Sequence, residues 1–169
     1  FGKGVVAHVA FAHPFCADMA GLLHGEARGL GITAHRGGTY VCMEGPLFST
    51  KAESLMHRQL GYSIIGMTAV PEAKLAREAE ICYQPVALVT DYDCWKEEDH
   101  VSTEKVVEHL MANVENAQRL LAAALPRLAA LPRSCPCARA LKGALFTDRK
   151  AMAPAAVKAL KPLIGKYLA

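Results

Sequence analysis

The sequence lacks a hydrophobic run long enough to cross a membrane. Its most apolar stretches are interrupted by His8, Pro126 or Pro132, before they reach the roughly 18–20 residues that a membrane helix needs. It also lacks a basic-then-apolar signal segment, and it begins with Phe1 rather than Met. We therefore expect no membrane partner, and we expect a mature chain, a cleaved chain or a fragment.

Acidic residues are nearly missing from the carboxyl-terminal quarter. Residues 126–169 contain nine Lys and Arg but only Asp148, whereas residues 1–125 contain 10 Lys and Arg against 15 Asp and Glu. A basic segment can attract nucleic acid through its phosphates, but aromatic residues do not alternate with the basic ones here to stack on bases. We interpret the segment as a solvated helix face or a subunit contact, with no nucleic-acid partner.

What is present is typical of one globular domain. The 169 residues are 52% hydrophobic and 21% charged, which excludes a disordered chain and a coiled coil. Apolar runs rich in β-branched residues alternate with helix-period segments, which indicates an α/β fold. We expect a single domain over 1–169, with a core part over 1–125 and a basic arm and helix over 126–169.

The pattern predicts four strands and five helices. The predicted strands are Gly4–Phe11, His35–Met43, Tyr62–Met67 and Tyr83–Thr90. The predicted helices are Cys16–Gly29, Thr50–Leu60, Pro71–Glu80, Thr103–Leu125 and Pro154–Leu168. We expect Pro126 to end the long helix and Pro162 and Gly165 to interrupt the last one. We expect residues 125–139 to form a loop or an arm that lies on a neighbouring subunit.

Two acids follow the last predicted strand. Asp91 and Asp93 are two residues apart, so in extended backbone they share a face. This end of a parallel strand is where open α/β sheets bind ligands. Two neighbouring carboxylates cannot both ionise cheaply, so the pKa of one should be raised, which suits a general acid. A helix cap with a solvated turn remains the alternative.

Two other strand-to-helix joints can hold a ligand. Thr68 precedes a predicted helix whose free N–H groups favour an anion or hydroxyl, although it can equally be a simple cap. Thr50 and Glu53 have the spacing of a capping box. Just before them, Phe48 is placed either to stack on a flat ligand or to join the core.

The six cysteines leave three interpretations open from the residues alone. They can be buried thiols, disulfides or metal ligands. Cys135 and Cys137 are separated by one residue, whereas paired zinc ligands are usually separated by two to four. We expect no metal.

Three motifs together resemble a known family. They are Glu44–Glu53, Gly66–Glu72 continued by Leu75–Ala79, and Thr90–Trp95. In this order and spacing they resemble the 5′-methylthioadenosine phosphorylases of the trimeric purine nucleoside phosphorylase superfamily, and members with a Cys-x-Cys motif most of all. The resemblance implies a phosphorylase/hydrolase-like α/β fold with a mixed central sheet flanked by helices. It also implies phosphorolysis of 5′-methylthioadenosine to adenine and 5-methylthioribose 1-phosphate.

The resemblance also implies a role for each matching residue. Asp91 is the acid that protonates the leaving purine, and Asp93 accepts a hydrogen bond from its 6-amino group. The other implied contacts are Phe48 and Ser49 for the base, Met67 and Thr68 for ribose and phosphate, and His8, Thr103, Val106 and Val107 for the 5′ group. Ser49 and Asp91 favour a 6-aminopurine, with adenosine as a second substrate and a 6-oxopurine phosphorylase as the alternative.

Further implications concern assembly and completeness. A histidine reaching a neighbour's site implies a homotrimer or a dimer of trimers, and the family implies a cytoplasmic enzyme with phosphate as co-substrate and no cofactor. Leu47 departs from the arginine common at its position, and the glycine-rich turn and Arg-His segment that bind phosphate have no counterpart. We therefore expect a fragment or a cleaved product, and a non-catalytic chain stays an alternative.

The resemblance also suggests how the cysteines pair. It favours a disulfide between Cys16 and Cys82 and a second between Cys135 and Cys137, with Cys42 and Cys94 as free thiols. A bridge across one residue is geometrically poor, so that second pair is equally suited to redox chemistry.

Overall fold

The computed structural model describes residues 1–2, 4–96 and 103–168, and this chain divides into two compact units. The first unit, here the cysteine unit, consists of Phe1–Met19, Val70–Gln84 and Pro132–Ala169. The second, here the βαβ unit, consists of Ala20–Ala69 and Pro85–Leu131. Four of the six cysteines fall in the cysteine unit, and the sheet falls in the βαβ unit.

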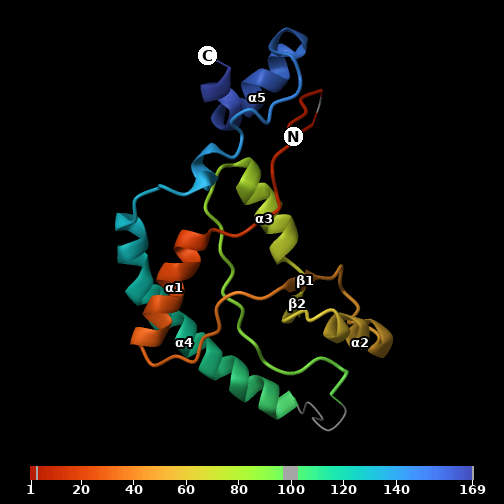
Figure 1. Ribbon diagram of the computed structural model, residues 1–169, viewed down its shortest axis with the longest axis vertical. Coiled ribbons are helices and arrows are strands. Elements are labelled where there is room, and N and C mark those ends of the chain that lie inside the picture. Colours follow the sequence, from red (N-terminus) through yellow and green to blue (C-terminus); the bar gives the residue numbers. More distant parts are fainter. Residues whose placement is uncertain (3, 97–102, 169) are drawn as a thin grey trace. The chain divides into compact units, whose positions relative to one another are not determined.

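The βαβ unit is built around a small parallel sheet. Its elements in chain order are β1 (Tyr40–Cys42), α2 (Lys51–Gln59) and β2 (Ile64–Gly66). The strands pair in parallel, with Tyr40 opposite Ile64. Parallel strands cannot be joined by a tight turn, so α2 serves as the crossover (Figure 1). A Cβ on Gly66 would come within 2.8 Å of the Tyr40 ring carbon Cζ, so any other residue there would force the Tyr40 side chain to move.

Helix α2 begins where the sequence predicts. The Thr50 hydroxyl accepts from the Glu53 N–H at 3.3 Å, and the Glu53 carboxylate accepts from the Thr50 N–H at 2.7 Å. This reciprocal pair satisfies two of the N–H groups that a helix start leaves unpaired. The predicted capping box is confirmed.

Two helices form the core of the βαβ unit. Helix α1 (Ala17–Gly29) packs Leu23 and Ala27 against residues of α4 (Thr103–Ala130), as Figure 1 also shows. Contrary to prediction, Pro126 lies inside α4 rather than after it. Leu128 packs on this core and Arg127 forms an ion pair with Glu26, and these contacts hold the helix beyond the proline. The expected loop over 125–139 is correspondingly shorter.

The cysteine unit contains the remaining helices. They are α3 (Ala69–Glu78), of which only Ala69 belongs to the other unit, η1 (Pro136–Arg139), η2 (Arg149–Ala151), α5 (Pro154–Ile164) and η3 (Gly165–Tyr167). Pro71 lies in the first turn of α3, where its missing N–H costs nothing. Contrary to prediction, helix α5 runs through Pro162, whereas the expected interruption at Gly165 is present as a change to a 3₁₀ turn. Val5, Leu141 and Ile164 are buried together as its core.

Two predicted strands are not formed in the described part of the chain. Residues 4–11 make one antiparallel bridge, between Ala7 and Leu145. Residues 83–90 contain no strand, and Val86 and Val89 are exposed. The prediction was wrong here because β-branched residues favour extended backbone, but a strand also needs a neighbouring backbone to fill its hydrogen bonds. The described sheet therefore has two strands.

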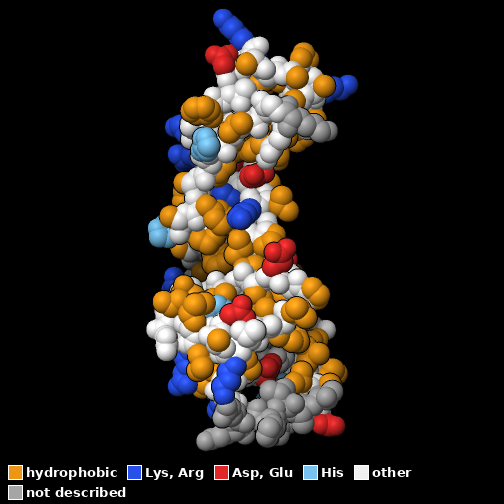
Figure 2. Space-filling model, turned by 90° about the vertical axis from the view of Figure 1, so that its right-hand side faces the viewer, with side chains coloured by type: hydrophobic (Ala, Val, Ile, Leu, Met, Phe, Trp, Pro, Cys, Tyr) orange, Lys and Arg blue, Asp and Glu red, His pale blue; other side chains and the backbone are white. Residues whose placement is uncertain are grey.

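Hydrophobic side chains lie on the surface in several places (Figure 2). Phe48, Leu47 and Phe146 expose 84%, 80% and 77% of their surface. Single exposed apolar residues are normal, but several large ones at this exposure are unusual for a surface that faces only water. Among the described helices, none has both the length and the apolar character of a membrane span.

Candidate active site

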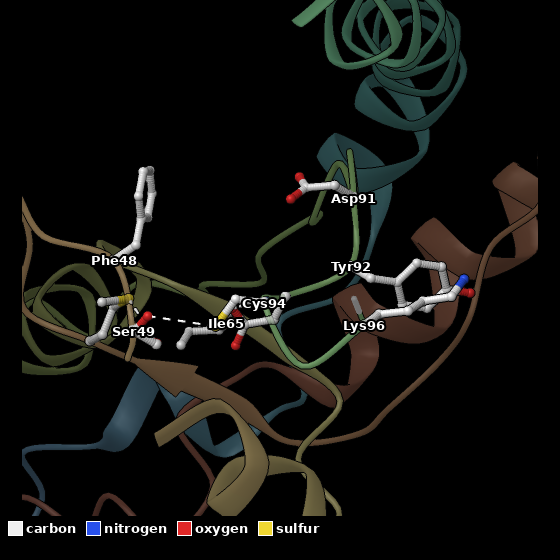
Figure 3. A pocket seen from close by; sticks show the side chains of 9 residues that line it. Phe48, Ser49, Ile65, Asp91, Tyr92, Cys94 and Lys96 are labelled. Carbon is white, nitrogen blue, oxygen red and sulfur yellow. Dashed lines mark hydrogen bonds between the residues drawn. The ribbon is translucent and has the colours of Figure 1, made fainter. Parts of the chain in front are cut away.

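A hollow of about 280 Å³ opens in the βαβ unit beside the carboxyl end of β1 (Figure 3). Its walls come from the end of β1 and the loop after it, from β2, and from the loop after the extended segment 83–90. The lining residues are Met43, Phe48, Ser49, Ile65, Asp91, Tyr92, Asp93, Cys94 and Lys96. Four of these were predicted to contact or protonate the purine base. Phe48 and Ser49 come from the first half of the chain and Asp91 and Asp93 from the second, yet all four line one hollow.

The two acids are held by short local hydrogen bonds. The Thr90 hydroxyl donates to Oδ1 of Asp91 at 2.5 Å, and the Cys94 N–H donates to Oδ1 of Asp93 at 2.8 Å. In Figure 3, Asp91 points toward the side where Phe48 stands, whereas Tyr92 points away from it. Neighbouring side chains alternate in this way in extended backbone; the expectation that Asp91 and Asp93 share a face stays a prediction.

The loop between β1 and α2 supplies the aromatic wall. The Phe48 ring stands out from the backbone and is 84% exposed (Figure 3). Ser49 is half-buried behind it, and its hydroxyl lies 3.8 Å from the sulfur of Met43. The Cys94 thiol donates to the Ser49 carbonyl at 3.7 Å, which ties the Phe48 loop to the loop of the two acids. Of the two possibilities for Phe48, the structure places it at the hollow and not in the core.

Sequence reasoning missed a cationic side of the hollow. The Lys96 ammonium lies 3.9 Å from the centre of the Tyr92 ring, close enough for a cation–π interaction. Asp93 could have indicated this side of the hollow, because Asp is favoured at the first position of a turn. In the structure such a turn is closed by the backbone N–H of Lys96, which donates to the Asp93 carbonyl at 3.1 Å. The chain just before the two acids is fixed by Asn113 of α4, whose side-chain amide donates to the Val89 carbonyl at 2.8 Å.

Several predicted site residues do not line this hollow. Met67 follows β2 and lies against Gly45, where an added Cβ would come within 2.6 Å of its sulfur. Thr68 is exposed immediately before α3. Val106 is half-buried and Val107 exposed in the first turns of α4, and of Thr103 only the backbone, at the start of α4, is described. Their roles stay predictions.

His8 belongs to the cysteine unit. Its ring packs edge-on against Phe146 at 5.4 Å between ring centres, and the backbone N–H of His8 donates to the Ala144 carbonyl at 2.8 Å. This local packing is compatible with both of its possible roles, as a strand histidine or as a group offered to a neighbouring subunit. Its contact with a 5′ group stays a prediction.

The predicted disulfide residues are brought together in the cysteine unit. All six cysteines are free thiols, and the sulfurs of Cys16, Cys82, Cys135 and Cys137 lie within 4.8 Å of one another. The sulfurs of Cys82 and Cys135, which are in different predicted pairs, are 3.3 Å apart. The structure therefore groups the predicted residues without distinguishing between pairings.

Comparison with known proteins agrees with this arrangement. The model of the phosphorylase superfamily matches residues 1–126, about three quarters of the chain. The chain belongs to the phosphorylase superfamily. The predicted α/β phosphorylase fold is thereby confirmed, with a small parallel sheet in the described part of this phosphorylase chain.

Relatives within the superfamily carry one activity in their names. The chain is 51% identical to S-methyl-5′-thioadenosine phosphorylase of Geobacter sulfurreducens, over 99% of this chain and 59% of that protein. It is 43% identical, with a TM-score of 0.89, to a crystal structure of methylthioadenosine phosphorylase from an antarctic soil metagenomic library, over 96% of this chain and 58% of that one. A methylthioadenosine phosphorylase from Schistosoma mansoni in complex with adenine matches at 32% identity and a TM-score of 0.74, over 83% and 56% of the two chains. This phosphorylase chain spans somewhat over half the length of the relatives it matches.

Proposed function

We propose that this chain takes part in the phosphorolysis of 5′-methylthioadenosine to adenine and 5-methylthioribose 1-phosphate, with adenosine as a possible second substrate. The observation that carries the proposal is the meeting of Phe48, Ser49 and the two acids at one hollow. An aromatic ring beside carboxyl groups suits a flat base that needs both stacking and a proton. The activity belongs to the pentosyltransferases, needs inorganic phosphate as co-substrate and needs no organic cofactor or metal.

The proposed chemistry assigns a different task to each acid. As phosphate attacks the anomeric carbon, the glycosidic bond breaks and N7 of the leaving adenine takes up a proton. Thr90 donates to Oδ1 of Asp91, so the second oxygen of that carboxyl is the one that delivers the proton. Asp93, whose Oδ1 is already an acceptor for the Cys94 N–H, suits acceptance from the 6-amino group. A 6-oxo base would offer Asp93 no donor at that position, which disfavours it.

The sites for ribose, phosphate and the 5′ group form a second part of the proposal. Met67 and Thr68 would contact ribose and phosphate, and α4 would contribute Val106 and Val107 to the 5′ pocket. Thr68 stands just before α3, where helix N–H groups favour an anion. His8 would reach the 5′ end of a neighbouring subunit's substrate.

Assembly and location are also proposed. Exposed Leu47, Leu75 and Phe146, at 80%, 68% and 77%, support burial of apolar surface in a homotrimer or a dimer of trimers. We place the enzyme in the cytoplasm, among small-molecule nucleosides and phosphate. Native mass spectrometry of the purified chain tests the assembly, and a purely monomeric species would contradict it.

The function is tested by following base release from two nucleosides, with and without phosphate. We expect adenine from 5′-methylthioadenosine to appear only with phosphate, and faster than hypoxanthine from inosine. Faster cleavage of inosine would favour the 6-oxopurine alternative. Release from neither nucleoside would favour the non-catalytic alternative, which intact-mass measurement of any co-purifying polypeptide would then examine.

A further inference from the structure

Four sulfur atoms meet in the cysteine unit, whereas the residues that line the hollow belong to the βαβ unit. Cys16 lies just before α1, Cys82 follows α3, and the other two flank Pro136 at the start of η1; all four are in one unit. These four cysteines, here the thiol cluster, are Cys16, Cys82, Cys135 and Cys137. Three of them are buried, with 2%, 9% and 4% of their surface exposed, and Cys82 is half-buried. Three segments remote in sequence thus converge on one point.

The spacing of the sulfurs suits a single metal ion. Their mutual distances all lie within 4.8 Å, and that between Cys82 and Cys135 is 3.3 Å. Four thiolates around one zinc ion at Zn–S distances of about 2.3 Å stand about 3.8 Å apart in a tetrahedron. The observed distances bracket that value, so small side-chain movements would complete the geometry. Sulfurs that surround a cluster of several irons would have to stand farther apart.

A backbone N–H also contacts the thiol cluster. For Cys135 itself, burial raises the pKa, but hydrogen bonds from the Cys82 thiol and the Cys137 N–H outweigh burial and lower it. An N–H that donates to a sulfur is the kind of outer contact that orients metal ligands.

We propose that the thiol cluster binds one Zn²⁺ ion in a tetrahedral tetrathiolate site. On binding, each thiol releases one proton to solvent and forms one Zn–S bond, so four protons leave and the site carries a net charge of −2 without any redox change. Basic residues near the site suit this negative charge. Arg133 and Arg139 each stand two residues from a ligand, and residues 126–169 contain nine Lys and Arg but only one Asp. The ion ties the amino-terminal segment and the end of α3 to the carboxyl-terminal region, so its role is structural.

Disulfides are the main competing arrangement for the same residues. A disulfide requires a sulfur separation of about 2.05 Å, whereas all four cysteines are free thiols and the sulfurs of Cys82 and Cys135 are 3.3 Å apart. A one-residue loop between Cys135 and Cys137 makes a poor disulfide, yet it allows both sulfurs to point to one ion from the two ends of a short turn. The geometry therefore favours a shared ion over two bridges.

Metal content and thiol count of the purified, unmodified chain provide the first test. The chain is prepared without added metal or chelator, and zinc and iron are measured by plasma mass spectrometry. We expect about one zinc per chain and six free thiols after denaturation with a chelator. Iron in place of zinc, no zinc retained or taken up at micromolar Zn²⁺, or only two free thiols would each overturn the proposal.

Substitutions provide the second test. Cys137→Ser is expected to lower zinc from about one ion per chain to well below half, whereas the matched Cys42→Ser, outside the thiol cluster in β1, keeps it. Because Cys137→Ser can also unfold the chain, the wild-type protein is reconstituted with Co²⁺. We expect the intense visible absorption of tetrahedral cobalt thiolate, abolished by equimolar Zn²⁺. Full zinc in Cys137→Ser, loss of zinc in Cys42→Ser, or octahedral cobalt spectra would contradict the assignment.

Discussion

The thiol cluster and the hollow of the candidate active site are opposite kinds of site. The thiol cluster is made of buried side chains from three segments, and three of its four members expose less than a tenth of their surface. The hollow is lined mainly by loops, together with Ile65 of β2, and Phe48, Tyr92 and Asp91 there are exposed. A buried site resists change because each member has many neighbours, whereas an open site can admit a ligand. Substitutions should therefore cost stability in the first and activity in the second.

The same contrast appears in how buried polar atoms are satisfied. In the cysteine unit, Glu80 is 7% exposed and accepts hydrogen bonds from the Leu141 N–H at 2.9 Å and the Tyr167 hydroxyl at 2.5 Å, besides an ion pair with Lys166. In the βαβ unit, the buried Ser54 hydroxyl and His57 Nδ1, both on α2, have no partner among the described residues. The unit that contains the hollow is thus the less completely satisfied one.

The largest effect is expected at Asp91. Replacing it with asparagine removes the proton that the departing adenine needs, so kcat for 5′-methylthioadenosine should fall by about 10²–10⁴-fold. The exposed side chain has few contacts to lose, so thermal unfolding should change little. Steady-state kinetics and thermal denaturation of the same preparation measure both. Asp18→Asn, an exposed acid in α1, is the matched control with unchanged kcat. Equal losses in the two variants would remove Asp91 from the acid role.

The second effect concerns stability in the cysteine unit. Glu80→Ala leaves the Leu141 N–H and the Lys166 ammonium without their carboxylate, and the free energy of unfolding should fall by about 3 kcal/mol. Glu115→Ala, an exposed site on α4, should change it by less than about 0.5 kcal/mol. Urea denaturation measures both. If Glu80→Ala and Glu115→Ala both changed the free energy of unfolding by a similar small amount, the contacts of Glu80 would make no net contribution to stability.

Acid should reproduce part of the Glu80 effect. Burial raises the pKa of Glu80, but hydrogen bonds from Lys166, Tyr167 and the Leu141 N–H outweigh burial and hold it below its usual value of 4.5. A carboxyl with a lowered pKa contributes stability that is present above pH 4.5 and is lost as pH falls through its folded-state value. The free energy of unfolding of the wild type should therefore fall as the pH is lowered below 4.5. In Glu80→Ala this part of the dependence should disappear, and an unchanged acid slope would contradict the assignment.

Local features of the fold were predictable from the sequence. The Thr50–Glu53 capping box and the Pro154 start of α5 follow from neighbouring residues, and the structure has both. The sequence could not show that segments 4–11 and 83–90 form no strand. A strand needs a neighbouring backbone to pair with, and the residues of the segment itself do not reveal whether one lies beside it. Pro126 was misjudged for a related reason: packing of Leu128 and the Arg127 ion pair decide where α4 ends.

The candidate site divides in the same way. Asp91 and Asp93 follow an apolar run and were singled out from the residues themselves, whereas the base-contact roles of Phe48 and Ser49 came from the family resemblance; all four residues line the hollow. The contact of Lys96 with Tyr92 depends on a turn and was missed. The meeting of four sulfurs was also missed, because sequence spacing relates Cys135 to Cys137 but says nothing of two other segments that arrive from far along the chain.

The third effect tests the aromatic wall. Phe48→Ala removes the surface on which a base would stack, and KM for 5′-methylthioadenosine should rise about tenfold, or about 1.4 kcal/mol. Unfolding should barely change, because the ring is 84% exposed. Phe48→Tyr keeps a ring and should retain most of the affinity, and Met111→Ala, exposed on α4, should leave KM unchanged. A KM unaffected in Phe48→Ala would show that the ring does not touch substrate.

The smallest effect has the opposite sign. The Ser54 side chain is 1% exposed and its hydroxyl has no partner in the described part of the chain. Ser54→Ala removes that unsatisfied group and adds a better helix former to α2, so the free energy of unfolding should rise by about 1 kcal/mol. Ser63→Ala is the matched control, because the Ser63 hydroxyl accepts from the Thr39 N–H at 3.1 Å and its removal should destabilise slightly. Urea denaturation of both variants decides the sign. Destabilisation by Ser54→Ala would mean that the hydroxyl has a partner after all, and the contrast between the two units would then rest on the exposure of the hollow alone.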